Sequence, residues 1–180
     1  MSDTVTIATL DDARALERRV RASATRACAT LSDLLASEPP LEVFRAMKFR
    51  RVGFVPTDAE RPTNLMQQVH QTFAYLAAIR GVEQLLRWHP EHAPFRVDVS
   101  AGAAPNIVSA DGQVVAETLA IITAVDNNKL KSDVERMRAH AAPHRYVFYY
   151  AEQGGEVMEA EDVRVVAVGD GADPDQPDRS

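Results

Sequence analysis

Apolar residues recur at helical spacing in two long stretches of the chain. Leu10, Ala13, Leu16 and Val20 open the first stretch and predict a helix over residues 9–36. A short helix over 41–48 should follow Pro39-Pro40, and a second long helix is predicted over 64–88. The segment 49–63 contains Gly53, Pro56 and Pro62, so we expect an irregular connection there.

After Pro90 the pattern changes from helical spacing to alternation. Phe95, Val97 and Val99 alternate with polar residues, which predicts a strand. Residues 106–110 and 113–123 predict a hairpin around Asp111-Gly112, and its second strand is apolar on both faces, as central strands are. A helix over 129–140 and strands over 145–151 and 163–168 complete the pattern.

This element order predicts one α/β domain over residues 1–169. It has N-terminal helices over 9–48, a core over 64–151 and a disordered acidic tail over 170–180. The 180 residues, 46% apolar and 26% charged, fit a single globular domain.

The formal net charge of −6 differs from the basic surplus of dedicated nucleic-acid binders. A DNA contact would therefore need a local basic patch. The first candidate run comprises Arg14, Arg18, Arg19, Arg21 and Arg26, and the second Arg45, Lys48, Arg50 and Arg51. We expect the first run to be a solvated helix face, whereas the second is equally compatible with a solvated surface and with a nucleic-acid contact.

The chain shows no sign of export or membrane insertion. No apolar run reaches the ~20 residues that span a bilayer, and the first residues lack the features of a signal peptide. We therefore expect a cytoplasmic protein without a membrane partner. Cys28 is the single cysteine, so no disulfide can form within the chain, and we expect a buried, inert thiol.

The helix–strand–hairpin–helix–strand order of residues 64–151 resembles the α-β-β-β-α-β core of the PD-(D/E)XK superfamily, the restriction-endonuclease-like fold. That family places Pro-Asp at the start of the second strand and Glu-x-Lys on the third. Pro105-Asn106 and Glu117-Thr118-Leu119 occupy these positions here, so both the first acid and the lysine are replaced. The resemblance covers about half of the chain.

The resemblance implies acidic side chains that converge on Mg²⁺ or Mn²⁺, which activates water for attack on a phosphodiester. The candidate metal ligands are Asn106, Glu117, Asp98 and Glu83, and the candidate catalytic residues are Glu117 with Lys129 or Lys131 in place of the missing lysine. Glu117 is the most informative of these, because an acid within so apolar a strand must be paired or bound to metal. A nearby arginine or backbone amide could satisfy it equally well.

Two histidine pairs have spacings that a zinc site could use, His89-x-x-His92 and His140-x-x-x-His144. Neither pair has a cysteine or carboxylate partner that the sequence identifies. We expect these histidines to be exposed polar residues.

Three hypotheses follow for the function. The first is a metal-dependent nuclease of restriction or repair type that acts on DNA, either active or impaired by the two replacements. The second is a non-catalytic nuclease-fold module for protein or nucleic-acid interaction, as a monomer or a homodimer. The third is an unrelated α/β domain with the same element order, since a fold does not determine a function.

Overall fold

The computed structural model describes residues 4–99, 105–120, 128–150, 157–160 and 162–169, the side chains of 157–160 excepted. One sheet contains seven strands in the order β1 (Val5–Ile7), β4 (Phe95–Val97), β5 (Ile107–Ser109), β6 (Val114–Ala120), β7 (His144–Tyr150), β9 (Val163–Val168) and β8 (Val157–Ala160). The helices are α1 (Leu10–Ser37), α2 (Pro40–Phe49), α3 (Leu65–Trp88), the 3₁₀ turn η1 (Pro90–His92) and α4 (Asn128–Arg138). A separate hairpin pairs β2 (Gly53–Val55) with β3 (Asp58–Thr63). The α/β class is confirmed.

The two long helices begin at polar caps that the sequence supplies. Thr9 accepts from the backbone N–H of Asp12, whose carboxylate accepts in return from the backbone N–H of Thr9, so α1 begins with a capping box. Asn64 caps α3 by accepting from the backbone N–H of Gln67. The predicted helices over 9–36 and 64–88 are therefore confirmed nearly to the residue.

Strand β6 is the centre of the seven-stranded sheet. It pairs antiparallel with β5 and parallel with β7, and all but its last residue are buried. The predicted central strand is confirmed over Val114–Ala120; residues 121–123 of the prediction lie outside the described part of the chain. The predicted order of elements across 64–151 is also the observed order, from α3 through β4, β5, β6 and α4 to β7.

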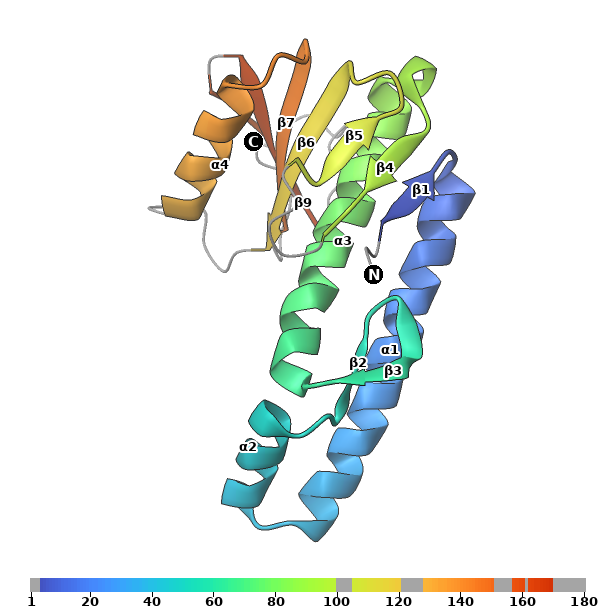
Figure 1. Cartoon of the computed structure of the whole chain (residues 1–180), viewed down its shortest axis with the longest axis vertical. Coiled ribbons are helices and arrows are strands. Elements are labelled where there is room, and N and C mark those ends of the chain that lie inside the picture. Colours follow the sequence, from blue (N-terminus) through green and yellow to red (C-terminus); the bar gives the residue numbers. More distant parts are fainter. Residues whose placement is uncertain (1–3, 100–104, 121–127, 151–156, 161, 170–180) are drawn as a thin grey trace, which may run out of the picture.

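The sheet separates two apolar cores and makes the domain three layers thick. Helices α1 and α3 cover one face through Leu16, Ile79 and Leu85, among others. Helix α4 covers the other face over β6, β7 and β9, where Leu130 and Met137 pack against Val147. Figure 1 shows α3 and α4 on opposite sides of the strands. Because successive strand residues point to opposite faces, alternate β6 side chains enter different cores.

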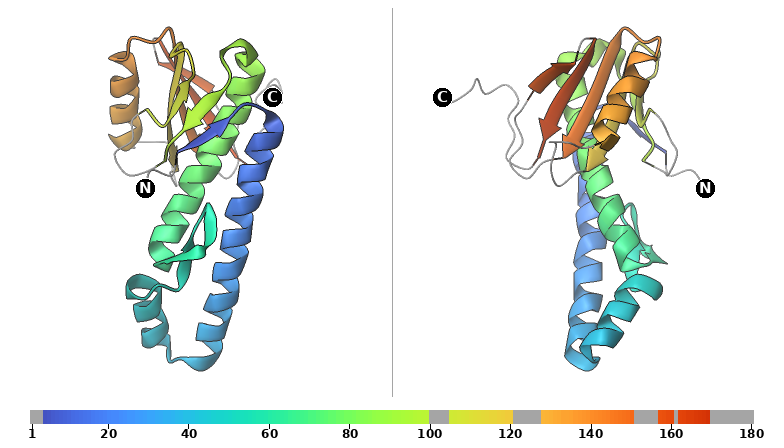
Figure 2. Two further views of the ribbon diagram at one scale, coloured as in Figure 1. Left: turned by 45° about the vertical axis from the view of Figure 1, so that its right-hand side comes forward. Right: turned by 90° about the vertical axis from the view of Figure 1, so that its left-hand side faces the viewer.

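A helical arm extends away from the sheet. It consists of the distal halves of α1 and α3, the β2–β3 hairpin and α2 at its tip (Figures 1 and 2). Seven large apolar side chains on α1, α2 and α3 remain 41–75% exposed, and most of them belong to this arm: Leu35, Leu41, Phe44, Phe49, Met66, Val69 and Phe73. Exposed apolar side chains in such number are typical of an interaction surface.

The expectation of an irregular connection over 49–63 was wrong, because tertiary contacts create the β2–β3 hairpin. The buried amide of Gln68 accepts from the backbone N–H of Phe54 and donates to Ser23. Ser23 Oγ in turn donates to the carbonyl of Val55, and the Arg19 guanidinium donates to the carbonyl of Thr57. Side chains of α1 and α3 thus supply hydrogen bonds to a hairpin too short to stand alone.

Four other observations bear on the sequence-based expectations. Strands β1 and β8 were not predicted, since three or four residues give almost no periodic signal. Cys28 is exposed rather than buried, because it lies on the outer side of α1. None of the helices among the described residues has the length and apolar character needed to cross a membrane. The predicted tail over 170–180 lies outside the described residues.

Arginines of both basic runs are paired with acids or carbonyl groups of the chain itself. Arg14 pairs with Asp11, and Arg21 pairs with Glu17. In the second run, Arg50 lies 3.6 Å from carboxylate oxygens of both Glu38 and Glu42. The solvated-face interpretation therefore suits the paired arginines of both runs.

Candidate functional site

Three residues of the predicted site form one row across three adjacent strands. The strand register pairs Val97 with Ile107 and Ile107 with Ala116. One residue further along, Asp98, Asn106 and Glu117 therefore stand side by side, on the face that alternates away from α1 and α3. Asn106 is bonded to both neighbouring strands, since it contacts the backbone of Asp98 and of Thr118.

The Asn106 side chain is fully engaged in holding these strands together. Its Oδ1 accepts from the backbone N–H of Thr118 at 2.9 Å and from the Thr118 hydroxyl at 3.2 Å. Its Nδ2 donates to the backbone carbonyl of Asp98 at 3.1 Å. Both lone pairs of the amide oxygen are used, so this oxygen has none left for a cation.

Glu117 lies at the centre of a compact charge cluster under α4. Its side chain is 4% exposed, and Oε1 accepts a hydrogen bond from Nη1 of Arg136. The same nitrogen lies 3.3 Å from Oδ1 of the buried Asp133, whose Oδ2 accepts from the ammonium group of Lys129 at 2.7 Å. These four residues, Glu117, Asp133, Lys129 and Arg136, are called the Glu117 cluster below.

The helical spacing of α4 brings its three members of the cluster together. Lys129, Asp133 and Arg136 are four and three residues apart, so they share the helix face that meets β6. Burial raises the pKa of the Glu117 carboxyl, the guanidinium of Arg136 opposes that rise, and the charge of Asp133 adds to it. The positive charge of Arg136 thus offsets the repulsion between the buried carboxylates of Glu117 and Asp133.

The Glu117 cluster does not fit Mg²⁺ or Mn²⁺ as it is arranged. These hard cations need several oxygen ligands, usually with one or two carboxylates among them. Here Arg136 and Lys129 already balance the two carboxylates, and the oxygen of Asn106 is saturated. The buried Oδ1 of Asp133 makes no hydrogen bond.

The remaining predicted residues lie in different surroundings. Glu83 belongs to α3, beneath the opposite face of the sheet, where it binds Arg80 at 3.0 Å together with Glu17. Lys131 is exposed on α4, whereas Lys129 joins the Glu117 cluster. Asp98 accepts from the hydroxyl of Thr4 at 3.1 Å on the β1 side of the row. The structure therefore brings Asp98, Asn106, Glu117 and Lys129 to one face of the sheet, and separates Glu83.

A second cluster gathers three histidines that are distant in sequence. His89 follows α3, His92 lies in η1, and His144 begins β7. All three are partly buried, and one ring nitrogen of each lies within 4.8 Å of those of the other two, close enough to hold a metal ion. The ring centroids of His89 and His144 are 4.4 Å apart. This group is called the histidine cluster.

Polar neighbours orient the histidine rings. His89 Nε2 shares a 2.6 Å hydrogen bond with the hydroxyl of Tyr146, and His92 Nδ1 shares one of 2.6 Å with Asp111 Oδ2. Burial lowers the pKa of His89, and the neighbouring His144 lowers it further. A hydrogen bond from Ser109, followed by those from the Gln113 backbone and His92, lowers the pKa of Asp111 well below its usual range. His89 is therefore kept neutral, and Asp111 is kept ionised.

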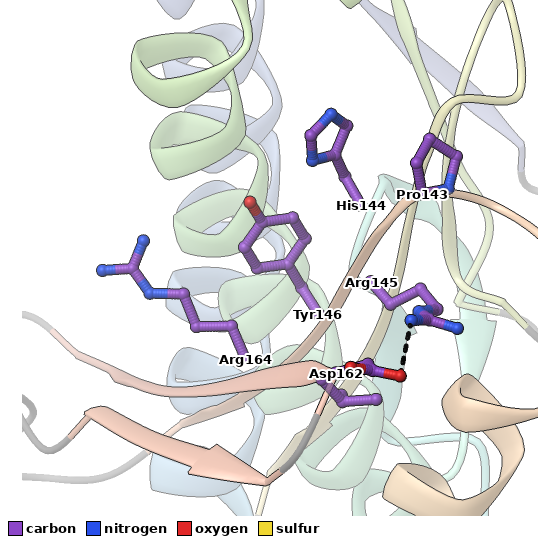
Figure 3. Close-up of a pocket in the computed structure, with 7 residues that line it drawn as sticks. Pro143, His144, Arg145, Tyr146, Asp162 and Arg164 are labelled. Atoms are coloured by element: carbon purple, nitrogen blue, oxygen red, sulfur yellow. Dashed lines mark ion pairs between the residues drawn. The ribbon is translucent and has the colours of Figure 1, made fainter.

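The histidine cluster adjoins an open hollow of about 230 Å³ beside the first residues of β7 and β9. Figure 3 shows His144 and Tyr146 along β7, with Arg164 on the neighbouring strand. Arg145 pairs with Asp162 at 3.4 Å on the rim, and Arg164 stacks on Trp88 at 4.3 Å. His144 and Tyr146 line the hollow, and both belong to or support the histidine cluster.

Comparisons with protein-family models, with curated proteins and with solved structures found no match for this chain. The geometry alone must therefore carry a functional argument. The structure brings together two groups of residues, the Glu117 cluster and the histidine cluster, that the sequence analysis did not place together. Asp133 and Arg136 had only their helical spacing as a signal, and His144 stands more than fifty residues after His92, a separation that no short motif covers.

Proposed function

We propose that this chain is a nuclease-fold domain that does not hydrolyse nucleic acid and serves as a protein-interaction module. The Glu117 cluster carries this proposal. The position where the PD-(D/E)XK family assembles a metal-binding acid pair is here neutralised by Arg136 and Lys129. A protein cation in place of a metal removes both the activated water and the charge that would stabilise the reacting phosphate.

The topology supports the relationship to the nuclease fold. Strand β5 is antiparallel between β4 and β6, β6 and β7 are parallel, and α3 and α4 cover opposite faces. This matches the arrangement that the resemblance implies for its helix, hairpin and crossover. Under this proposal, the row of Asp98, Asn106 and Glu117 corresponds to the catalytic strands of the family.

The helical arm supports a protein partner. Phe44 and Phe49 of α2 are 67% and 75% exposed, far more than apolar side chains of a core. Arg45 and Arg50 of the second basic run are engaged by Glu38 and Glu42, which weakens the case for a DNA contact there. An apolar tip rimmed by paired charges is typical of a protein interface.

The catalytic alternative is a Mg²⁺- or Mn²⁺-dependent DNA nuclease, and one observation favours it. Glu117 is buried and its carboxyl pKa is raised, as for many acids at active sites. In that reading Lys129 would replace the motif lysine, and a metal bound together with DNA would displace Arg136. Lys131, which is exposed, has no role in this version.

Incubation with plasmid, linear and single-stranded DNA in millimolar Mg²⁺ or Mn²⁺ separates the two proposals. We expect no cleavage by the wild-type protein. Metal-dependent cleavage that disappears in a folded Glu117→Gln protein would overturn the non-catalytic proposal. Cleavage that persists in Glu117→Gln would indicate a contaminating nuclease.

Sedimentation velocity tests whether the helical arm binds a second copy of the chain, the simplest protein partner. We expect concentration-dependent self-association that Phe44→Ser abolishes and that Arg45→Ser, at the neighbouring exposed position, leaves intact. A wild-type protein that stays monomeric at all concentrations would exclude a homodimer through the arm.

A further inference from the structure

We propose that His89, His92 and His144 form a binding site for a transition-metal ion of the Zn²⁺ class. The site is distinct from the Glu117 cluster, which lies on the α4 side of the sheet. Three imidazole nitrogens are the donor set of a borderline-soft ion, and they discriminate against Mg²⁺ and Ca²⁺, which prefer oxygen.

The present geometry is close to what such an ion needs. With Zn–N bonds of about 2.0–2.1 Å, three nitrogens of a tetrahedral site lie roughly 3.3 Å apart. The three nitrogens here are within 4.8 Å of one another, so a modest movement of partly buried rings closes the site. His89 precedes the 3₁₀ turn that His92 ends, and His144 faces both rings from β7.

The surroundings of the rings are those of metal-binding histidines. Such histidines usually engage their second ring nitrogen with a carboxylate, a hydroxyl or a carbonyl, which fixes the ring and makes it a stronger ligand. Asp111 occupies Nδ1 of His92, and Tyr146 occupies Nε2 of His89. Nε2 of His92 and Nδ1 of His89 are therefore the nitrogens directed to a shared ion.

A carboxylate stands beside these two nitrogens. Oε1 of Glu91 lies 3.6 Å from His92 Nε2 and 3.8 Å from His89 Nδ1. Its side chain is 62% exposed, so it can become the fourth ligand or leave that position to water. Glu91 and Asp111 together also supply two negative charges, which match the charge of a divalent ion.

The site differs from the pairs suggested by sequence spacing. His140, four residues before His144, is not part of it, because its Nδ1 accepts from the backbone N–H of Ala142. His140 is therefore a matched control, being a histidine in the same segment with a local structural contact. Tyr146 is a positioning residue, since it reaches the ion only through His89.

The test uses the untagged full chain, stripped with a chelator and titrated with Co²⁺, Zn²⁺ and Mg²⁺. We expect one equivalent of Co²⁺ to produce the visible absorption bands of a tetrahedral site, Zn²⁺ to displace it, and Mg²⁺ to have no effect. At a free Zn²⁺ concentration about 100 times Kd, the melting temperature should rise by roughly 5–10 °C.

Variants identify the ligands. His92→Ala and His144→Ala should abolish the Co²⁺ bands, whereas His140→Ala should retain them. Tyr146→Phe should keep the bands but weaken Zn²⁺ binding by about 10–100-fold, the usual effect of removing a group that orients a ligand. Far-UV circular dichroism of each metal-free variant shows whether it is folded.

Three results would overturn the proposal. The first is a folded wild-type protein that binds no stoichiometric Co²⁺ or Zn²⁺. The second is a folded His92→Ala that keeps the bands, and the third is an equal loss in His140→Ala. All three are independent of nuclease activity, so they leave the proposed function untouched.

Discussion

Replacing Arg136 by methionine is the sharpest perturbation of the Glu117 cluster. The substitution keeps much of the side chain's apolar length and removes the guanidinium that bonds Glu117 and contacts Asp133. The buried carboxylates of Glu117 and Asp133, 4% and 1% exposed, then have only the positive charge of Lys129 beside them. Like charges forced together in this way are expected to destabilise the fold rather than leave it unchanged.

The expected loss of stability follows from how deeply Arg136 and the carboxylates it contacts are buried. Removing one partner of a fully buried ion pair costs about 3–5 kcal/mol, because the other charge remains uncompensated. The Arg136 side chain is 47% exposed, so water can partly replace it, and Lys129 still neutralises one acid. We therefore expect a loss of about 2 kcal/mol at pH 8, or roughly 4–8 °C in melting temperature for a domain of this size.

The sign of the pH dependence tests the cause. Without Arg136 the pKa of Glu117 in the folded state rises further, so protonation relieves the repulsion as the pH falls. The loss in Arg136→Met should therefore shrink between pH 8 and pH 5, and millimolar Mn²⁺ should restore part of the stability at pH 8. Arg14→Met is the matched control, since its pair with Asp11 is exposed on both sides and should matter by less than about 1 kcal/mol.

Thermal melts of the wild type and both variants at pH 5 and pH 8 decide the matter. An Arg136→Met protein that melts like the wild type at pH 8 would refute the neutralisation argument. A loss of equal size at both pH values would show that packing, rather than charge, is responsible.

Three further predictions concern other parts of the structure. In Gly81→Ala the new Cβ would lie 2.7 Å from Cδ2 of Phe148, so overpacking of about 1–3 kcal/mol should outweigh the helix-propensity gain of about 1 kcal/mol, and a raised midpoint in urea would contradict this. Gln68→Ala leaves the backbone N–H of Phe54 without its partner and should lower the free energy of unfolding by about 1–3 kcal/mol. Relative to the wild type, amide hydrogen exchange should accelerate more in β2 than in β6. Because burial raises the pKa of Glu117 above its ordinary 4.5, the ionised carboxyl destabilises the folded state as the pH rises through that pKa. The melting temperature of Glu117→Gln minus that of the wild type should therefore increase from pH 4 to pH 8, and a flat difference would exclude this cause.

The sequence by itself determined the elements that a local pattern can encode. Spacings of three and four set α1 and α3, which in the structure begin at the capping residues Thr9 and Asn64. The apolar run around Glu117 identified the central strand and the buried acid within it. These features depend on residues within a few positions of one another, which is why periodicity and capping suffice to predict them.

Only the tertiary structure decided which groups meet. The β2–β3 hairpin depends on Ser23 and Gln68 from two different helices, so its own residues 49–63 suggested a loop. Arg136 was one of several arginines, and only the packing of α4 on β6 made it the partner of Glu117. The histidine cluster joins the end of α3 to the start of β7. Glu83, which the resemblance implied as a metal ligand, lies on the face of the sheet opposite Glu117. Contacts of this kind depend on how a sheet orders its strands and which face each helix covers, and no local period records that arrangement.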